Sequence, residues 1–178
     1  MTVNSLEGAW SVDASASRAC FSVRDKLLTT AHGCLPVTGG RAVVGADGSV
    51  ITAELELSVA GLDTGNRRRD SHLRTPGFLD AQAFPTIRVQ LAPSQAGSGS
   101  TWVGPGVLTA RGRQAPLDLT AELTRRPGPT ASIEDATSVR VRVTGRLDRR
   151  PLQIKAPTFV VGRVVDIDAD LTFSRTGP

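Results

Sequence analysis

Strict alternation of apolar and polar residues is the feature that most constrains how this chain can fold. In Ile51–Val59 every odd position is apolar and every even position is polar. The same pattern recurs in Leu117–Leu123, Val139–Val143 and Val165–Phe173. Because successive side chains of a β-strand point to opposite faces, each of these segments predicts a strand with one face in a core and one face in water.

Shorter segments with a weaker pattern surround Trp10, Phe21, Ile87 and Val107, and we expect these to be strands as well. Gly and Pro residues cluster between the segments, which is typical of hairpin turns. The sequence therefore predicts roughly eight or nine strands that are joined mostly by short turns.

No segment has a helical period that lasts long enough to make a helix that covers a sheet. The apolar face must then meet a second sheet or close on itself, and closure also removes exposed strand edges. We predict an all-β fold, an antiparallel lipocalin-like barrel of about eight strands or slightly more, with a two-sheet sandwich as the alternative. The 178 residues fit a single domain over residues 1–178.

The alternation breaks between Leu62 and Phe84, in a connection that is too long for a hairpin and too polar at its start for a strand. We expect Asp70 to cap a short helical turn over residues 71–74, which ends at Pro76 and Gly77. Long connections in compact domains are usually functional. We therefore predict a short helical lid around residues 66–82 that folds onto one end of the barrel. Its apolar contacts would come from Leu73, Phe78, Leu79 and Phe84.

Aromatic residues make up only 4% of the chain, and there is no Tyr. β-Proteins normally use aromatic side chains to fill their interior, so a barrel lined by Val, Leu, Ile and Ala would leave an empty tube. A barrel of about eight strands is just wide enough to hold one ligand. The predicted wall residues are Phe21, Leu27, Leu55, Leu57, Val89, Leu108, Leu119, Val141 and Phe173. The alternative is that these residues form an ordinary packed core.

The net charge of +4 comes almost entirely from arginine, since Lys26 and Lys155 are the only lysines. The basic clusters at residues 67–69 and 149–150 are short and contain no aromatic residues, so we do not expect nucleic-acid binding. The first ten residues lack the basic start and apolar run of a signal peptide, and no segment is long and apolar enough to span a membrane as a helix. We therefore expect a cytoplasmic protein without a transmembrane segment.

The two cysteines, Cys20 and Cys34, have two interpretations. In a reducing compartment they would be small buried apolar residues, whereas two successive strands could also bring them face to face as a disulfide. A metal site that adds His32 and His72 would match no usual ligand spacing, so we expect neither a metal nor a cofactor.

Four short segments carry a resemblance to a known family. They are residues 63–65 (Asp-Thr-Gly), 69–74 (Arg-Asp-Ser-His-Leu-Arg), 78–80 (Phe-Leu-Asp) and 84–87 (Phe-Pro-Thr-Ile). Together with residues 10–13, 17, 21–24 and 107–112, they resemble the YceI-like family, lipocalin-like barrels thought to bind polyisoprenoids and other long lipids. The resemblance covers nearly the whole chain and implies the same barrel and the same type of ligand.

The sequence departs from the family pattern at three places. Ala16 stands where the family usually has His, and Leu79 replaces the second Phe of a Phe-Phe-Asp element. A late Asn-Arg-x-x-Phe-Gly element corresponds here to residues 148–152, Asp-Arg-Arg-Pro-Leu. The predicted fold does not depend on these positions.

The function that follows is a carrier of a long apolar ligand, such as a polyisoprenoid, an isoprenoid quinone or a fatty-acid-like lipid. Arg69, Asp70, His72 and Arg74 would form a polar collar that meets the ligand's head group, together with the apolar Leu73, Phe78 and Phe84. Alternatively, Arg69 and Asp70 only hold the lid in place. A homodimer is left open.

Two other functions remain as alternatives. An enzyme could use His72 and Asp70 as an acid–base pair on an isoprenoid or polyketide-like substrate, although no familiar catalytic motif accompanies them. An interaction module would instead have a barrel interior that is completely filled by side chains.

Overall fold

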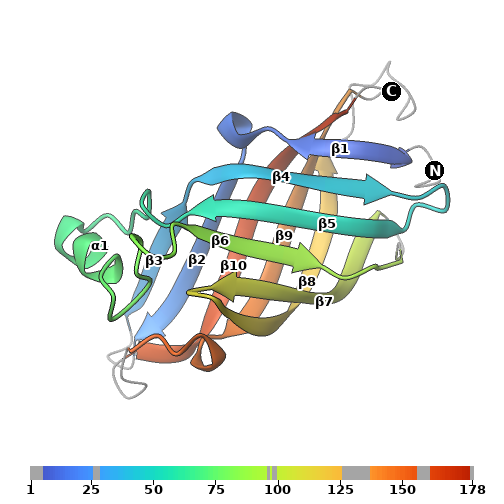
Figure 1. Cartoon of the computed structure of the whole chain (residues 1–178). Helices are drawn as coiled ribbons and strands as arrows, with labels where there is room; N and C mark the ends of the chain where they lie inside the picture. The colour runs from blue at the N-terminus through green and yellow to red at the C-terminus, as the bar shows by residue number, and fades with distance from the viewer. Residues whose placement is uncertain are drawn as a thin grey trace.

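One antiparallel sheet, wrapped into a barrel, makes up most of the molecule (Figure 1). The structure is a computed structural model that describes residues 6–25, 29–95, 97, 100–125, 137–155 and 161–176. The strands are β1 (Gly8–Val12), β2 (Arg18–Asp25), β3 (Thr30–Leu35), β4 (Val37–Val44), β5 (Val50–Ser58), β6 (Thr86–Leu91), β7 (Thr101–Ala110), β8 (Arg113–Arg125), β9 (Ser138–Asp148) and β10 (Val161–Arg175). The short helices are η2 (Ala14–Ala16), α1 (Arg67–Leu73) and η4 (Arg150–Leu152).

Two of the barrel's strands are each broken into two pieces. The helix η2 separates β1 from β2, and Pro36 separates β3 from β4. β1 pairs with β4 and β2 pairs with β3, while β10 pairs with both β1 and β2 along one edge and with β9 along the other. The ten strands of the described residues therefore occupy eight positions around a closed barrel, which confirms the predicted fold class.

The inner face follows the alternation seen in the sequence. On β10 the inward residues are Ile167, Ala169 and Leu171, and between them lie exposed aspartates. β5 departs from this pattern at its start, because a register shift pairs Val44 with Val50. As a result Val50 is buried, whereas Ile51, which the alternation placed inward, is 50% exposed.

Cross-strand ion pairs cover the outer face. Arg146 contacts Asp166 at 3.0 Å and Arg88 contacts Glu56 at 2.8 Å, and in each pair the two residues are directly opposite in the register. Arg142 and Asp168 form a two-pronged contact between β9 and β10. These pairs explain the polar half of the alternation, although exposed pairs of this kind add little stability, typically up to about 1 kcal/mol each.

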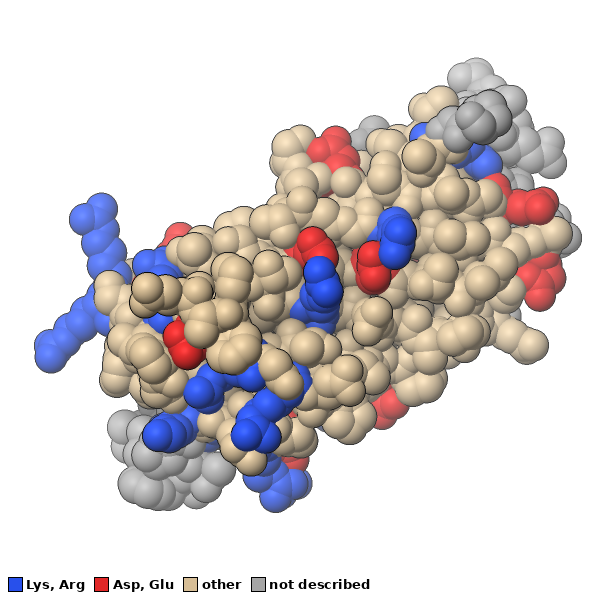
Figure 2. Space-filling model, viewed as in Figure 1, with Lys and Arg blue, Asp and Glu red and all other residues tan. Residues whose placement is uncertain are grey.

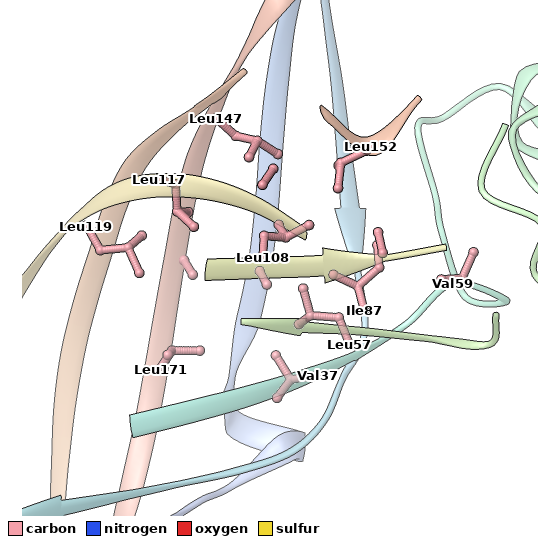
Figure 3. Close-up of a cluster of buried hydrophobic side chains, with 14 residues drawn as sticks. Val37, Leu57, Val59, Ile87, Leu108, Leu117, Leu119, Leu147, Leu152 and Leu171 are labelled. Carbon is pink, nitrogen blue, oxygen red and sulfur yellow. The ribbon is translucent and has the colours of Figure 1, made fainter. Parts of the chain in front are cut away.

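Two strand glycines make room for one core side chain. A Cβ atom on Gly106 of β7 would lie 2.9 Å from Cδ1 of Leu119, and a Cβ atom on Gly145 of β9 would lie 2.7 Å from its Cδ2. Leu119, on β8 between them, points into the barrel interior beside the other leucines of the core (Figure 3). The absence of a side chain at both glycines therefore leaves space for the side chain of Leu119 between them.

The barrel end that lies away from α1 is closed by two tryptophans. Trp10 and Trp102 are 3% and 4% exposed, and they pack with Leu6, Val44 and other buried residues. Each indole N–H donates to a backbone carbonyl, that of Trp10 to Leu6 and that of Trp102 to Gly48. This end of the barrel is therefore packed, with its buried polar atoms satisfied.

Cys20 and Cys34 form a disulfide across β2 and β3. The two residues are directly opposite in the register, with Cα atoms 4.0 Å apart. Their positions alternate with those of Ala19 and Phe21, which face the interior, so the bond lies on the outer side of the wall. The interpretation of the cysteines as two free, buried thiols is therefore wrong, because the register of this hairpin places their side chains together.

Within the described parts of the chain, no helix has the length and apolar character needed to cross a bilayer.

The disulfide should contribute measurably to stability. We expect replacement of both cysteines, Cys20→Ser with Cys34→Ser, to lower the free energy of unfolding by about 2–4 kcal/mol, because the bond restricts the unfolded chain. Urea unfolding followed by tryptophan fluorescence measures this difference. The wild-type protein in reductant serves as the control and should unfold like the double variant; equal stability of the oxidised wild type and the double variant would contradict the prediction.

Candidate functional site

An apolar cavity of about 400 Å³ occupies the barrel interior, and its lining residues run from the tryptophan-closed end to the lid. Small-molecule sites in proteins typically measure about 300–1,000 Å³, so this volume is large enough for a ligand. Side chains from every part of the wall point toward it, including Leu57 from β5, Leu108 from β7 and Leu171 from β10 (Figure 3). The inward side chains therefore leave the centre of the barrel unfilled.

Most of the residues predicted as ligand contacts border this cavity. They are Phe21, Leu55, Leu57, Arg69, Leu73, Phe78, Val89, Leu108, Leu119, Val141 and Phe173. Asp70, His72 and Phe84 are not among the lining residues. Leu27 lies outside the described residues.

The helix of the lid begins at Arg67, earlier than the turn over residues 71–74 that the sequence suggested. Asn66, not Asp70, is the N-cap of α1, and its side chain accepts a hydrogen bond from the backbone N–H of Arg69. The prediction that Asp70 caps the helix was therefore wrong. Asp70 lies inside the helix, where it is buried, and its carboxylate is used for a different contact.

That contact ties the helix to the strand connection before it. Oδ1 of Asp70 accepts hydrogen bonds from the backbone N–H of Thr64 at 3.0 Å and from the Thr64 hydroxyl at 2.5 Å. Arg69 donates from the other side, through Nε to Thr64 Oγ1 at 2.7 Å and through Nη2 to the Thr64 carbonyl at 2.9 Å. Both residues therefore hold Thr64. The same hydrogen bonds fix the position of the Arg69 side chain, and Arg69 borders the cavity.

The other polar residues predicted for the collar lie away from the cavity. His72 is exposed, and its ring packs edge-on against Phe78 at a centroid distance of 4.5 Å. Arg74 donates through Nη2 to the Leu62 carbonyl at 2.5 Å. Both residues therefore support the lid and its apolar side chains.

Arg111 joins three loops at the lid end of the barrel. It lies in the turn between β7 and β8 with a positive φ of 54°. Its guanidinium donates to the carbonyl of Pro76, in the segment after α1, and to that of Gln153, at the end of η4, each at 3.0 Å. The backbone N–H of Lys155 also donates to the Gly77 carbonyl. These contacts place η4 beside the lid.

Arg149, just before η4, is a buried cation that borders the cavity. It is 5% exposed, and it donates to the carbonyls of Gly162 at 2.9 Å and Ile154 at 3.2 Å. Burial lowers the pKa of its guanidinium, and the nearby Asp148 opposes this shift. Hydrogen bonds from Arg150 lower the pKa of Asp148 itself to about 2, so this carboxylate stays ionised beside Arg150 at neutral pH.

Arg149 and Thr64 were not predicted as site residues, although the sequence contained a signal for each. The inward positions of β9 are Val139, Val141, Val143 and Leu147, and the same period of two continues to Arg149. An arginine in this register was taken as part of a surface cluster because charged side chains are rarely buried. Thr64 belongs to the Asp-Thr-Gly segment that carries the family resemblance, but its contacts with Arg69 and Asp70 could not be read from that segment.

Among the residues that the structure describes, no group of three or more His, Cys, Asp and Glu side chains is arranged to hold a metal ion.

Comparison with known proteins identifies the family. The sequence profile of the YceI-like domain matches residues 10–173. The fold is similar to the crystal structure of BcnA from Burkholderia cenocepacia, with a TM-score of 0.75 at 14% identity, over 90% of this chain and 98% of that one.

Two further solved structures are also similar. A polyisoprenoid-binding domain from Saccharophagus degradans gives a TM-score of 0.68 at 14% identity, over 94% of this chain and 98% of that one. The YceI protein of Campylobacter jejuni gives 0.67 at 16% identity, over 82% of this chain and 85% of that one. No functionally curated protein matches the sequence. The profile match, which spans almost the whole barrel, shows that this chain belongs to the YceI-like family.

Proposed function

We propose that this protein binds and carries an amphiphile, with its long apolar tail in the barrel interior and its polar head at the α1 end. The observation that carries this proposal is the cavity of about 400 Å³, whose lining is almost entirely apolar. The polyisoprenoid-binding domain from Saccharophagus degradans, which shares the fold, is consistent with it.

The lining favours a tail without specific polar groups. Aliphatic side chains from β5 to β10 surround the cavity along its length. Each CH₂ group moved from water into such a site gains roughly 0.8 kcal/mol, so a long chain could bind tightly without any hydrogen bond. A polyisoprenoid, an isoprenoid quinone and a fatty-acid-like lipid all fit this description.

The placement of cationic groups favours a head group at the lid end. Arg69 and Arg149 both border the cavity, the first from α1 and the second from the segment that packs beside the lid. At the opposite end the lining consists of the tryptophan cluster. An anionic or strongly polar head is therefore better accommodated next to α1.

The two alternatives fit the geometry less well. The carboxylate of Asp70 is engaged by Thr64, and the exposed His72 does not border the cavity, so this pair is poorly placed to act on a bound substrate. A plugged interaction module would need a filled interior. We therefore favour binding over catalysis.

The cellular location and the oligomeric state stay predictions. The sequence led us to expect the cytoplasm, whereas a disulfide such as Cys20–Cys34 is typical of an oxidising compartment. We propose that the protein acts where this bond can persist. The homodimer that the sequence left open also stays a prediction.

Filling the cavity should weaken ligand binding. We expect Leu57→Trp, which adds an indole to the cavity lining, to weaken binding of a fluorescent fatty acid by about tenfold or more, or at least 1.4 kcal/mol. Fluorescence titration of the delipidated protein measures this loss. The matched control is Val103→Trp, because Val103 lies on the outside of β7 and is 64% exposed.

The control should bind like the wild type, and both variants should keep the far-ultraviolet circular dichroism of the barrel. Undiminished binding by Leu57→Trp would mean that the probe does not enter the interior. Native mass spectrometry of the protein as purified should additionally detect a bound lipid, and repeated spectra of empty protein from different preparations would count against a carrier.

The charge of the head group should also affect affinity. We expect a saturated fatty acid to bind about tenfold or more tightly than the fatty alcohol of the same length, because hydrogen bonds to charged groups are stronger than those between neutral groups. Arg149→Gln should reduce this preference to near unity, whereas Arg150→Gln, a change to the exposed neighbour, should retain it. Competition against the fluorescent probe gives both affinities.

The wild-type comparison keeps this test valid even if Arg149→Gln destabilises the segment around η4. Equal affinities of the acid and the alcohol for the wild type would rule out recognition of an anionic head while leaving the binding of the tail intact. A preference that persists in Arg149→Gln would assign it to another residue, with Arg69 the first to test.

A further inference from the structure

Basic residues gather at the end of the barrel that the lid covers (Figure 2). We name as the lid-end cations Arg67, Arg68, Arg69, Arg111, Arg113 and Lys155. The first three belong to α1, Arg111 lies in the turn between β7 and β8, Arg113 begins β8, and Lys155 follows η4. Hydrogen bonds among these three segments, described above for Arg111 and Lys155, bring them together at one end.

The lid-end cations have no acidic partner, whereas several arginines of the barrel wall do. On the wall, Arg41, Arg88, Arg142 and Arg146 each form an ion pair with an aspartate or glutamate. Within the described part of the chain, none of the lid-end cations forms an ion pair. In the same described part of the chain, Arg18, Arg24 and Arg140 on the wall also have no ion pair, but they are scattered over β2 and β9, whereas the six lid-end cations gather at one end.

Within the described residues, none of the carboxylates close to the lid, Asp80 of the lid itself included, forms an ion pair with a lid-end cation. Asp70 is buried and directed at Thr64, and Asp63 accepts a hydrogen bond from the backbone N–H of Gly65. Asp148 contacts Arg150 and lies 4.0 Å from Arg163, neither of which is a lid-end cation. The lid thus presents its positive charge to the surroundings.

We propose that the lid end docks on an anionic lipid bilayer, with the lid-end cations against the head groups and the cavity directed toward the membrane. This inference rests on the proposed carrier function, because a ligand with a long apolar tail resides in a bilayer. The half-buried Leu73 and Phe78, which border the cavity, lie on the same lid as Arg67 and Arg68. Cationic residues around the covered end of an apolar cavity fit an anionic membrane better than an acidic protein or a nucleic acid.

Binding of the delipidated protein to vesicles tests this proposal. We expect co-sedimentation with vesicles of phosphatidylcholine and phosphatidylglycerol, and little with phosphatidylcholine alone. Raised salt should weaken the interaction, because exposed charges are screened within about 10 Å at 0.1 M ionic strength. Equal binding to both kinds of vesicle, or stronger retention on double-stranded DNA than on the anionic vesicles, would overturn the proposal.

A pair of charge-reversal variants locates the surface. Arg68→Glu should weaken binding to the anionic vesicles by about tenfold, since each basic residue near an anionic surface contributes a factor of roughly five and the new carboxylate is repelled. Arg140→Glu is the matched control: it changes the charge equally, but Arg140 is exposed on β9 next to Val139 of the tryptophan cluster. Equal losses in both variants would mean that net charge, not the lid end, drives the binding.

Titration with the fluorescent fatty acid in the absence of vesicles separates this proposal from the carrier function. Arg68→Glu should bind the probe like the wild type. If the wild type binds the probe but not the anionic vesicles, the proposal that the lid end docks on a membrane is wrong and the carrier function stands. If it binds the anionic vesicles but no probe, the carrier function fails while the docking surface stands.

Discussion

The pairing of β10 with three other strands is the interaction on which the rest of the structure depends. This strand of 15 residues pairs with β9 along one edge and with β1 and β2 along the other, so it closes the sheet. Because the sheet is closed, the backbone N–H and C=O groups of its strands find hydrogen-bond partners within the sheet. Closure also separates the inward side chains from water. The apolar interior, its packed end and its covered end all follow from this closed wall.

The two ends of the barrel differ in chemistry because different kinds of residue close them. At one end Trp10 and Trp102 are buried, and each indole N–H is bonded to a backbone carbonyl. At the other end α1 is held over the opening by hydrogen bonds among Thr64, Arg69 and Asp70. The interior between these ends is lined mainly by aliphatic side chains, which are too small to fill it.

Much of this arrangement could be predicted, because alternation reports directly which face of a strand meets the core. The strands around Leu57, Leu119 and Leu171 were expected from it, and the barrel followed from the lack of covering helices together with the family resemblance. Alternation does not reveal register, so the outward turn of Ile51 and the pairing of Cys20 with Cys34 required the structure.

The residue that caps α1 and the burial of Arg149 were also not predicted from the sequence. Asn66 and Asp70 are both good caps in isolation, and only the contact of Asp70 with Thr64 decides between them. Arg149 continues the inward period of β9, but the general rule that arginines lie at the surface outweighed that pattern.

Because the two tryptophans close one end, the cavity of the barrel is open to a ligand only from the lid end. A tail that enters beside α1 must stop when its tip reaches the indoles of Trp10 and Trp102, because these side chains are packed and hydrogen-bonded. Methylene groups beyond that depth would stay in water and add nothing. For the proposed carrier function this sets a limit: affinity should rise with tail length only until the cavity is full, and longer homologues should gain no more.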